Sequence, residues 1–563
     1  MKSSVFALFI LFCLSCATPG AKQTADLLLL NGQFFTADST EGVTALAIRG
    51  DRIVYVGDET GARALAGDST KVIDLQGAFA MPGLIDGHGH FNALGQSVVN
   101  LNFLNTTSWQ QVLDQTAERA STTTAGQWIE GRGWHQEKWT ESVAGSVGGY
   151  PRHDALSART PNHPVVLGHA SGHALLANAR AMELAGVSRE TSDPEGGRIL
   201  RDASGKPTGV FEENAMSLID KPLTDWKNKR SEAEKQAEFD ETAKRAAEAC
   251  LQLGITSFQD AGSNFWELEQ YRRLAENGKL PIRLWAMAKR PQAHEMDKLK
   301  SFPQIGAGNG HFTCRAVKAY ADGALGSYGA WLLEPYSDRP ELSGQLVTPL
   351  DTLSLVAERC AQLGLQYCVH AIGDRANREV LNIMAARKPE GKRWRMEHAQ
   401  HVHPDDIPRF AQLGVVASMQ AIHCTSDAPF VPKRLGMDRA RTGAYVWRSL
   451  IDSGAHLANG TDAPVEDVAP LPNLFASVTR RRPGGPEAFF PEQAMTRREA
   501  LLSYTIWNAW AAFEENEKGM LKSGYLADIA VFSKNLLTCT EEEMLEAKVV
   551  YTIVGGKIAV SRQ

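Results

Sequence analysis

The sequence predicts an α/β protein built on a (β/α)8 TIM barrel, with a small β-sandwich formed from both chain ends and a large insertion after barrel strand 1. Eight apolar runs that end in polar residues alternate with helical stretches, which is the pattern of such a barrel. Short β-type runs stand at both ends of the chain. One interval between barrel strands is far longer than a single crossover, which indicates an inserted subdomain.

The composition is that of an ordinary folded protein. The chain has 563 residues, of which 43% are hydrophobic and 22% charged, so disorder and a polytopic membrane protein are both disfavoured. The formal net charge of -6 is spread along the chain without a long run of either sign. Binding to a nucleic-acid backbone needs a concentrated basic surface, so no nucleic-acid partner is expected.

Residues 1–22 are interpreted as a leader. Lys2 precedes the apolar stretch 5–14, which is too short to span a bilayer as a helix. Small residues flank Cys16, and the segment resembles a bacterial lipoprotein signal in which this cysteine is lipidated. We expect an exported protein, periplasmic or in the cell envelope, that meets the membrane only through this lipid anchor. A plain secretory signal and a retained anchor helix stay open.

The two ends of the mature chain show the same β-type pattern. Residues 23–80 contain "ALAIRGDRIVYVGD" and residues 515–563 contain "YLADIAVFS" and "VVYTIVGGKIAV", all short apolar runs broken by Gly, Asn or Asp. We expect the ends to pair into one sandwich that flanks the barrel.

The barrel is assigned to residues 81–514. The stretch 234–254 between strands one and two is amphipathic, with Gly254 as a stop signal, and predicts a helix. The predicted strands lie at 83–90, 255–260, 282–288, 314–320, 366–370, 394–398, 415–420 and 456–462.

The insertion is assigned to about residues 92–250. Its segments "GRGWHQEKW" and "GHASGHALLAN" gather Trp, His and Gly in loop-like sequence. It leaves the barrel at the carboxyl end of the first strand, where active sites of such barrels lie, so we expect it to cover the site.

The motif "GLIDGHGHF" closes the first strand with His88 and His90. Residues two apart on a strand point to the same face, and Gly87 and Gly89 leave space around the two imidazoles. This pair is predicted to form half of a metal site.

Ionisable residues occupy later strands in the same way. Lys318 lies in the predicted fourth strand, in "AVKAYADG". His370 ends the fifth strand in "YCVHAIGD", His398 ends the sixth in "WRMEHAQ", and Asp462 ends the eighth in "LANGTDAP". The carboxyl ends of all strands meet at one barrel mouth. Imidazoles and carboxylates suit a divalent ion, and zinc is the ion expected.

These residues resemble the amidohydrolase superfamily, and more narrowly the branch that includes N-substituted formamide deformylases. "AVKAYADGALGSYGA", "HAIGDRAN" and "GTDAPVED" look like that branch, and the likeness covers nearly all of the chain after the leader. The resemblance implies a metal centre holding one or two ions and a carboxylated Lys318 as a bridging ligand. The implied ligands are His88, His90, Lys318, His370, His398 and Asp462.

The expected chemistry is hydrolysis by metal-activated water, with Asp462 as the catalytic proton carrier. Lys318 has a simpler interpretation, in which it extends toward solvent or pairs with Asp322. The substrate contacts predicted are Trp134, Asp322 and His423. Each has an alternative: packing of the insertion for Trp134, a turn before Gly323 for Asp322, and a solvent-facing loop for His423.

The expected substrate is a small molecule with a non-peptide C–N bond, such as an amide, formamide or carbamate. The same centre can hydrolyse esters, lactones or phosphotriesters, and this alternative stays open. A lipid-anchored binding protein without catalysis is a further alternative, although all six ligand positions are filled. Assembly as a homo-oligomer is left open.

Overall fold

The computed structural model describes residues 24–562, apart from residues 137, 138, 171, 173, 195, 196 and 486. The predicted leader, with Cys16, lies outside the described residues. Within the described part of the chain, no helix combines the length and the apolar character needed to cross a membrane.

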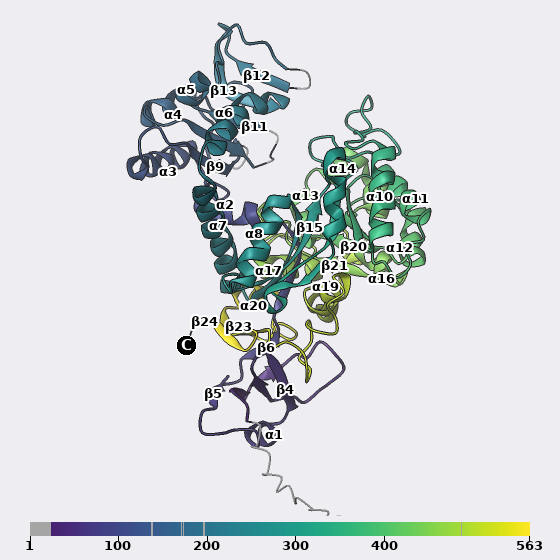
Figure 1. Cartoon of the computed structure of the whole chain (residues 1–563). Coiled ribbons are helices and arrows are strands. Elements are labelled where there is room, and N and C mark those ends of the chain that lie inside the picture. The colour runs from purple at the N-terminus through teal and green to yellow at the C-terminus, as the bar shows by residue number, and fades with distance from the viewer. Residues whose placement is uncertain are drawn as a thin grey trace, which may run out of the picture.

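Eight parallel strands form the centre of the molecule, as predicted, and the short β16 (Gln304–Gly306) pairs antiparallel with one of them (Figure 1). Each of the eight pairs with the next in chain order, and helices such as α10 (Leu350–Leu363) and α11 (Asp374–Ala385) surround the sheet. The strands are β7 (Leu84–Gly89), β14 (Ile255–Ser263), β15 (Arg283–Lys289), β17 (Phe312–Tyr320), β18 (Gln366–Ala371), β19 (Arg395–His398), β20 (Val416–Met419) and β21 (Leu457–Asn459).

The helix predicted before the second strand is α7 (Glu232–Gln252). Ser231 and Glu234 form a capping box at its start, which satisfies two backbone N–H groups that have no partner within the helix. Its apolar face, including Phe239 and Cys250, is buried in the core. Gly254 follows with a φ of +80°, a conformation that glycine adopts without strain and that ends the helix.

The first and last strands meet through a side chain rather than through a continuous ladder. The Asn508 amide nitrogen donates to the carbonyl oxygens of Ile85 and Asn459, each at 2.7 Å, and its oxygen accepts from the Asn459 N–H at 3.0 Å. Further along, the Asp462 N–H donates to the His88 carbonyl at 2.7 Å. The barrel is therefore closed by the Asn508 side chain at one level and by the loop that carries Asp462 at the next.

Both chain ends contribute to a β-sandwich, as predicted. One sheet has the order β4 (Arg52–Gly57), β3 (Ala45–Arg49), β1 (Leu27–Leu30), β5 (Lys71–Asp74). In the other, β2 (Gln33–Phe34) and β6 (Phe79–Pro82) join β22 (Ile529–Phe532), β23 (Val549–Val554) and β24 (Lys557–Ser561). Residues from both sheets, such as Leu46 and Ile553, share one hydrophobic core.

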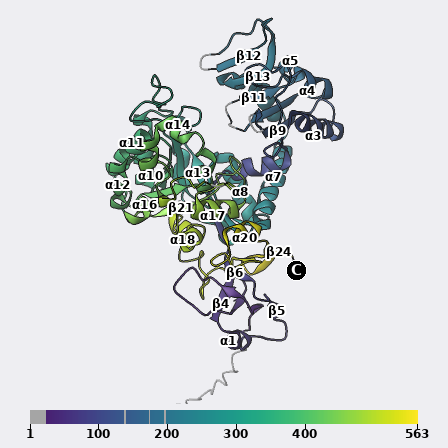
Figure 2. The ribbon, with the colours of Figure 1, turned by 180° about the vertical axis from the view of Figure 1, so that it is seen from behind.

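The segment between β7 and β14 contains a subdomain with its own sheet. Six strands run in the order β12 (Gly197–Arg201), β13 (Pro207–Glu213), β11 (Ala174–Ala177), β10 (Val165–His169), β9 (Ile129–Trp134), β8 (Leu101–Asn102). The chain enters through α2 (Phe91–Val99) and returns through α7. Figure 2 shows the subdomain at the end of the molecule opposite the β-sandwich.

Candidate metal centre

The site begins at the end of β7, where His88 and His90 enter the barrel mouth. The glycines beside them are required by close packing. A Cβ on Gly87 would lie 2.5 Å from the Asn508 side-chain oxygen, and one on Gly89 would lie 2.4 Å from the Phe258 ring. A larger residue at either position would have to displace the Asn508 side chain or the Phe258 ring. The packing around the two imidazoles therefore requires glycine at both positions.

The orientation of His88 is fixed from behind by Glu397 on β19. His88 Nδ1 lies 2.5 Å from Glu397 Oε2, and both side chains are fully buried. Arg395 pairs with the same carboxylate, Nε to Oε1 at 2.8 Å. Burial would raise the pKa of Glu397, but Arg395 and His88 hold it well below its usual value. The anionic carboxylate accepts the Nδ1 proton of His88 and leaves Nε2 directed at the site.

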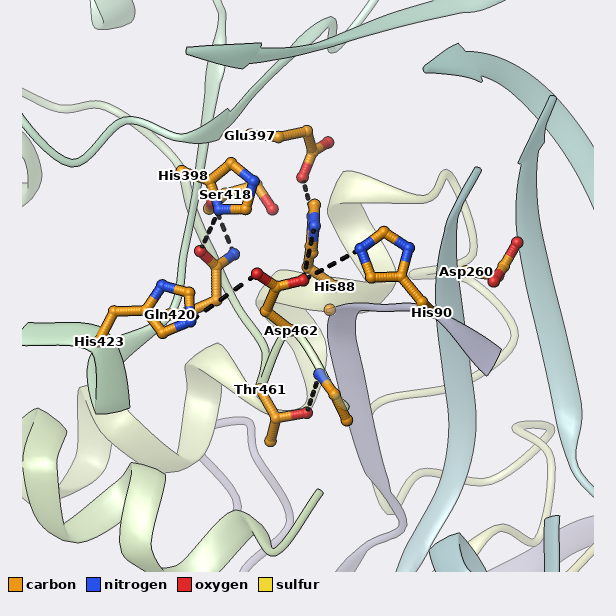
Figure 3. A network of polar contacts seen from close by, with 12 residues as sticks. His88, His90, Asp260, Glu397, His398, Ser418, Gln420, His423, Thr461 and Asp462 are labelled. Atoms are coloured by element: carbon orange, nitrogen blue, oxygen red, sulfur yellow. Dashed lines mark hydrogen bonds and ion pairs between the residues drawn. The ribbon is translucent and has the colours of Figure 1, made fainter. Parts of the chain in front are cut away.

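His398 is positioned by Gln420 in a similar way. Its Nδ1 lies 2.7 Å from the Gln420 Oε1 acceptor, so Nε2 is the nitrogen left for a ligand (Figure 3). His398 has a φ of +76°, in the left-handed region that a non-glycine residue rarely adopts. This backbone turn at the strand end lets Glu397 and His398, which are adjacent in sequence, both serve the same site.

Asp462 lies on the loop after β21 and faces the first-strand histidines. Its Oδ1 is 3.2 Å from His90 Nε2 and 3.6 Å from His88 Nε2 (Figure 3). Burial would raise the pKa of Asp462, but the close approach of His90 Nε2 and the nearby His88 and His398 rings hold it well below the usual range. The carboxylate form, which can bind a cation, is therefore favoured.

The Asp462 loop is held in place by a buried carboxylate on β7. Asp86 Oδ2 accepts from the Thr461 hydroxyl at 2.6 Å, and Oδ1 accepts from the Thr461 N–H at 3.0 Å. Burial raises the pKa of Asp86 to about 7. Asp462 itself has a φ of +58°, so these bonds stabilise a backbone conformation that the residue would otherwise avoid.

His370 and Lys318 complete the cluster from β18 and β17. The His370 ring lies 4.5 Å from the His398 ring, centroid to centroid. Lys318 is 1% exposed, and its Nζ lies 4.9 Å from the Tyr320 ring centroid. Among the described residues no carboxylate forms an ion pair with this ammonium, and Asp322 in particular does not. The arrangement leaves a buried cation beside three imidazoles, which is costly for an unmodified lysine.

The cluster fits a divalent ion. His88, His398 and Asp462 each offer a ligand atom, and these atoms lie within 4.8 Å of one another. Within the described residues, His88 Nε2, His370 Nε2 and Asp462 Oδ1 are buried without a hydrogen-bond partner, which is uncommon unless a ligand supplies one. Burial, aided by Lys318, lowers the pKa of His88 to about 4 and that of His370 to about 3. Both rings therefore stay neutral, the form that binds metal.

Of the three predicted substrate contacts, Trp134 and Asp322 hold their own segments in place, and only His423 lies beside Asp462. Trp134 is fully buried in the core of the inserted subdomain, and its indole N–H donates to the Leu167 carbonyl at 2.8 Å. The Asp322 carboxylate accepts the backbone N–H groups of Trp331, Ile372 and Gly373 at 2.8–2.9 Å. Both side chains are thus engaged in holding their own segments.

His423 is the predicted contact that lies at the centre. It belongs to α13 (Ala421–Asp427), is 8% exposed, and places Nε2 3.8 Å from Asp462 Oδ2 (Figure 3). The Gln400 amide lies 3.0 Å from its Nδ1. If the amide donates, Nδ1 is an acceptor and Nε2 carries a proton directed into the site.

Sequence reasoning did not identify the residues that orient the ligands, namely Glu397, Gln420 and Asp86. The "MEHAQ" segment shows Glu397 beside a predicted ligand, but strand alternation assigns the two residues to opposite faces. Asp86 stands two residues before His88, so strand alternation puts both side chains on the same face. This spacing could have identified Asp86 as a residue of the site.

Comparison with known proteins agrees with this geometry. The chain matches the model of the "Amidohydrolase family" over residues 71–560. It is 33% identical to "Protein LONG AFTER FAR-RED 3" of Arabidopsis thaliana, over 97% of this chain and 93% of that protein. It is 27% identical to "N-substituted formamide deformylase" of Arthrobacter pascens, over 96% of this chain and 99% of that protein.

A solved structure shows the same architecture. The crystal structure of an uncharacterized metal-dependent hydrolase from Pyrococcus horikoshii OT3 superposes with a TM-score of 0.75 at 28% identity, covering 92% of this chain and 99% of that one. The resemblance inferred from the ligand motifs is confirmed. With a matching family model over most of its length, a TIM barrel and a His/Asp cluster at the barrel mouth, the chain belongs to the amidohydrolase family.

Proposed function

We propose that the protein is a metal-dependent hydrolase that cleaves an amide, formamide or carbamate C–N bond of a small molecule. The observation that carries the proposal is the buried cluster at the barrel mouth, where two ring nitrogens and a carboxylate oxygen have no hydrogen-bond partner among the described residues. The similarity to an N-substituted formamide deformylase over nearly the whole chain supports the choice of bond. Membership of the family alone supports hydrolysis without specifying the bond.

The residues proposed to hold the cation are His88, His90, Lys318, His370, His398 and Asp462. We propose zinc, as one or two ions, with Lys318 carboxylated so that its buried charge becomes negative. A divalent ion supplies Lewis acidity, which lowers the pKa of water toward ~7 and polarises a carbonyl group.

The two oxygens of Asp462 suit different tasks. Oδ1 faces His88 and His90, whereas Oδ2 faces His423. In the proposed reaction Oδ1 completes the ligand set. Oδ2 accepts a proton from the attacking water and then donates it to the leaving nitrogen, which needs protonation because an amide anion leaves poorly. In the same proposal His423 Nε2, 3.8 Å from Asp462 Oδ2, orients the substrate oxygen beside this carboxylate.

A substrate panel tests the proposal. Zinc-loaded protein is assayed for hydrolysis of N-formyl and N-acyl amides and carbamates, alongside esters, lactones and phosphotriesters. We expect turnover of C–N substrates, and a loss of at least ~100-fold in kcat for Asp462→Asn. Turnover confined to esters or phosphotriesters would show that the bond is assigned wrongly, and retention of an unhydrolysed ligand by metal-replete protein would favour a binding role.

We further propose that the leader directs export and that Cys16 carries the lipid anchor. The apolar stretch 5–14 and the small residues around this cysteine support the proposal. Labelling of cells with a fatty-acid analogue should mark the full-length protein, and the label should disappear in Cys16→Ser. Unchanged labelling of that variant would exclude Cys16 as the lipidated residue.

A further inference from the structure

Arg132 connects the inserted subdomain to the loop that carries Asp462. It lies on β9, and its guanidinium donates a hydrogen bond to the carbonyl oxygen of Pro464, two residues beyond Asp462. Glycines flank it on both sides: a Cβ on Gly131 would lie 2.6 Å from the Phe103 ring, and Gly133 has a φ of +94°. The strand is therefore packed tightly next to Arg132, while the arginine itself extends across to the barrel mouth.

Arg132 carries a charge that is partly removed from solvent. The side chain is half-buried, and within the described part of the chain it forms no ion pair with a carboxylate. Burial lowers its pKa, and the charge that opposes this effect is that of Asp462. Once Asp462 is engaged with a cation, Arg132 is a partly desolvated cation without an anion of its own. Such a group favours an anionic ligand.

The place of Arg132 relative to Asp462 indicates which part of a substrate it would meet. Asp462 returns a proton to the leaving nitrogen in the proposed reaction, so the amine half of the substrate lies on the Asp462 side. Pro464 belongs to the same loop as Asp462, and the Arg132 guanidinium contacts this loop through the Pro464 carbonyl. A guanidinium binds a carboxylate through two parallel N–H···O bonds, a geometry that a neutral group does not match.

We propose that Arg132 binds a carboxylate on the amine half of the substrate, so that the preferred substrates are N-acyl or N-formyl amino acids and related aminocarboxylates. This inference rests on the proposed function and narrows its substrate class. It makes Arg132 a specificity-determining residue supplied by the insertion rather than by the barrel.

The test compares two substrates that differ only in charge. N-formylglycine and N-formylglycinamide, and the corresponding N-acetyl pair, are offered to zinc-loaded protein, and release of formate or acetate is measured. We expect the wild type to favour the carboxylates. In Arg132→Gln, the ratio of kcat/KM for carboxylate over amide should fall by about 10- to 100-fold, mainly through KM. Arg132→Lys should retain part of the preference.

The matched control is Arg189→Gln, which changes an exposed arginine of the same subdomain. It should keep the wild-type ratio. Absence of a carboxylate preference in the wild type overturns the proposal without need of any variant. An equal loss on both substrates in Arg132→Gln also overturns it, because Arg132 would then act only by holding the Pro464 loop.

A binding measurement separates this inference from the proposed function. If none of the amides is hydrolysed, the proposed function fails, but calorimetric binding of N-acetylglycine and N-acetylglycinamide to the zinc-loaded protein can still be compared. Weaker binding of the carboxylate alone in Arg132→Gln supports the assignment of Arg132. Equal binding of both compounds by wild type and variant contradicts it.

Discussion

His88 Nδ1 and Glu397 Oε2 lie 2.5 Å apart in the closed interior of the barrel, and neither side chain is exposed to solvent. Glu397 is in turn paired with Arg395, whose guanidinium also donates to the Gly87 carbonyl at 2.7 Å. His88, the first ligand of the proposed metal centre, is thus held by the buried Arg395–Glu397 ion pair on β19. We therefore expect the affinity of the site for metal to depend on Glu397.

Replacement of Glu397 by Gln should weaken metal binding by about 10- to 100-fold, because a neutral amide is a poorer acceptor for the His88 ring proton. Zinc affinity is measured by competition with a chromogenic chelator. Asp260→Asn is the matched control, since Asp260 is a buried carboxylate at the same mouth that accepts from the Phe91 N–H and the Ser263 hydroxyl. Equal affinities for wild type and Glu397→Gln would contradict the orienting role.

Replacement of Lys318 by Ala should reduce zinc content and lower kcat/KM by more than ~100-fold, because a bridging ligand is removed. Short carboxylic acids added to the assay should restore part of the activity by occupying the vacated space. Lys289→Ala, at the exposed end of β15, serves as the control. If Lys318→Ala keeps its metal and activity and shows no rescue, the lysine is not a ligand.

Replacement of Asn508 by Leu should destabilise the barrel by about 3 kcal/mol or more. The change leaves the Ile85 and Asn459 carbonyls and the Asn459 N–H buried without partners, and each such loss costs ~1–3 kcal/mol. Denaturant unfolding followed by circular dichroism measures the change. The exposed Asn105 provides the control, since Asn105→Leu should stay within ~0.5 kcal/mol of wild type.

His401 should make the folded protein sensitive to mild acid. Both ring nitrogens are buried without a hydrogen-bond partner among the described residues, and burial lowers the pKa of this imidazole to about 3. The unfolded chain takes up the proton near pH 6.5, whereas the folded chain does not, so the stability that His401 contributes above that pH is lost as pH falls.

The His401→Leu variant isolates this contribution. Between pH 7.5 and 5 the unfolding free energy of the wild type should fall by about 2 kcal/mol more than that of the variant, at ~1.4 kcal/mol per pH unit below the unfolded pKa. Denaturant titrations of both proteins at the two pH values provide the comparison. Parallel losses in the two proteins would show that the buried ring does not resist protonation.

The barrel was predictable because each strand leaves a clear pattern. A strand that is buried on both faces appears in the sequence as an apolar run. Residues of the site stand near the carboxyl ends of several strands, so an ionisable residue there marks where the run ends. Two strands differ from their predicted ends by three residues: β14 continues to Ser263 where the run 255–260 was predicted, and β21 ends at Asn459 where the run 456–462 predicted a strand through Asp462. At β21 the difference arises because the N–H groups of Thr461 and Asp462 bond to the Asp86 carboxylate and the His88 carbonyl rather than to the neighbouring strand β20.

The supporting residues were not predictable because they depend on contacts between distant segments. Glu397 meets His88 only after the barrel has curved round, and regular alternation would have kept it away from a site shared with His398. Trp134 shows the opposite error, in which a residue predicted at the site lies in a packed core instead. Its glycine-rich surroundings suggested a loop at the mouth, but its place in the packed sheet of the insertion is decided by neighbours such as Leu167, far along the chain.

The Asn508 closure also bears on the order of synthesis. Ile85 belongs to the first barrel strand made by the ribosome, yet the amide that closes its seam is added more than four hundred residues later, and β6 waits for its partner β22 in the same way. Neither sheet can be completed on a partly made chain. The nascent protein must keep two unfinished edges from aggregating until Asn508 and β22 have been synthesised, so both sheets are completed late relative to their first strands.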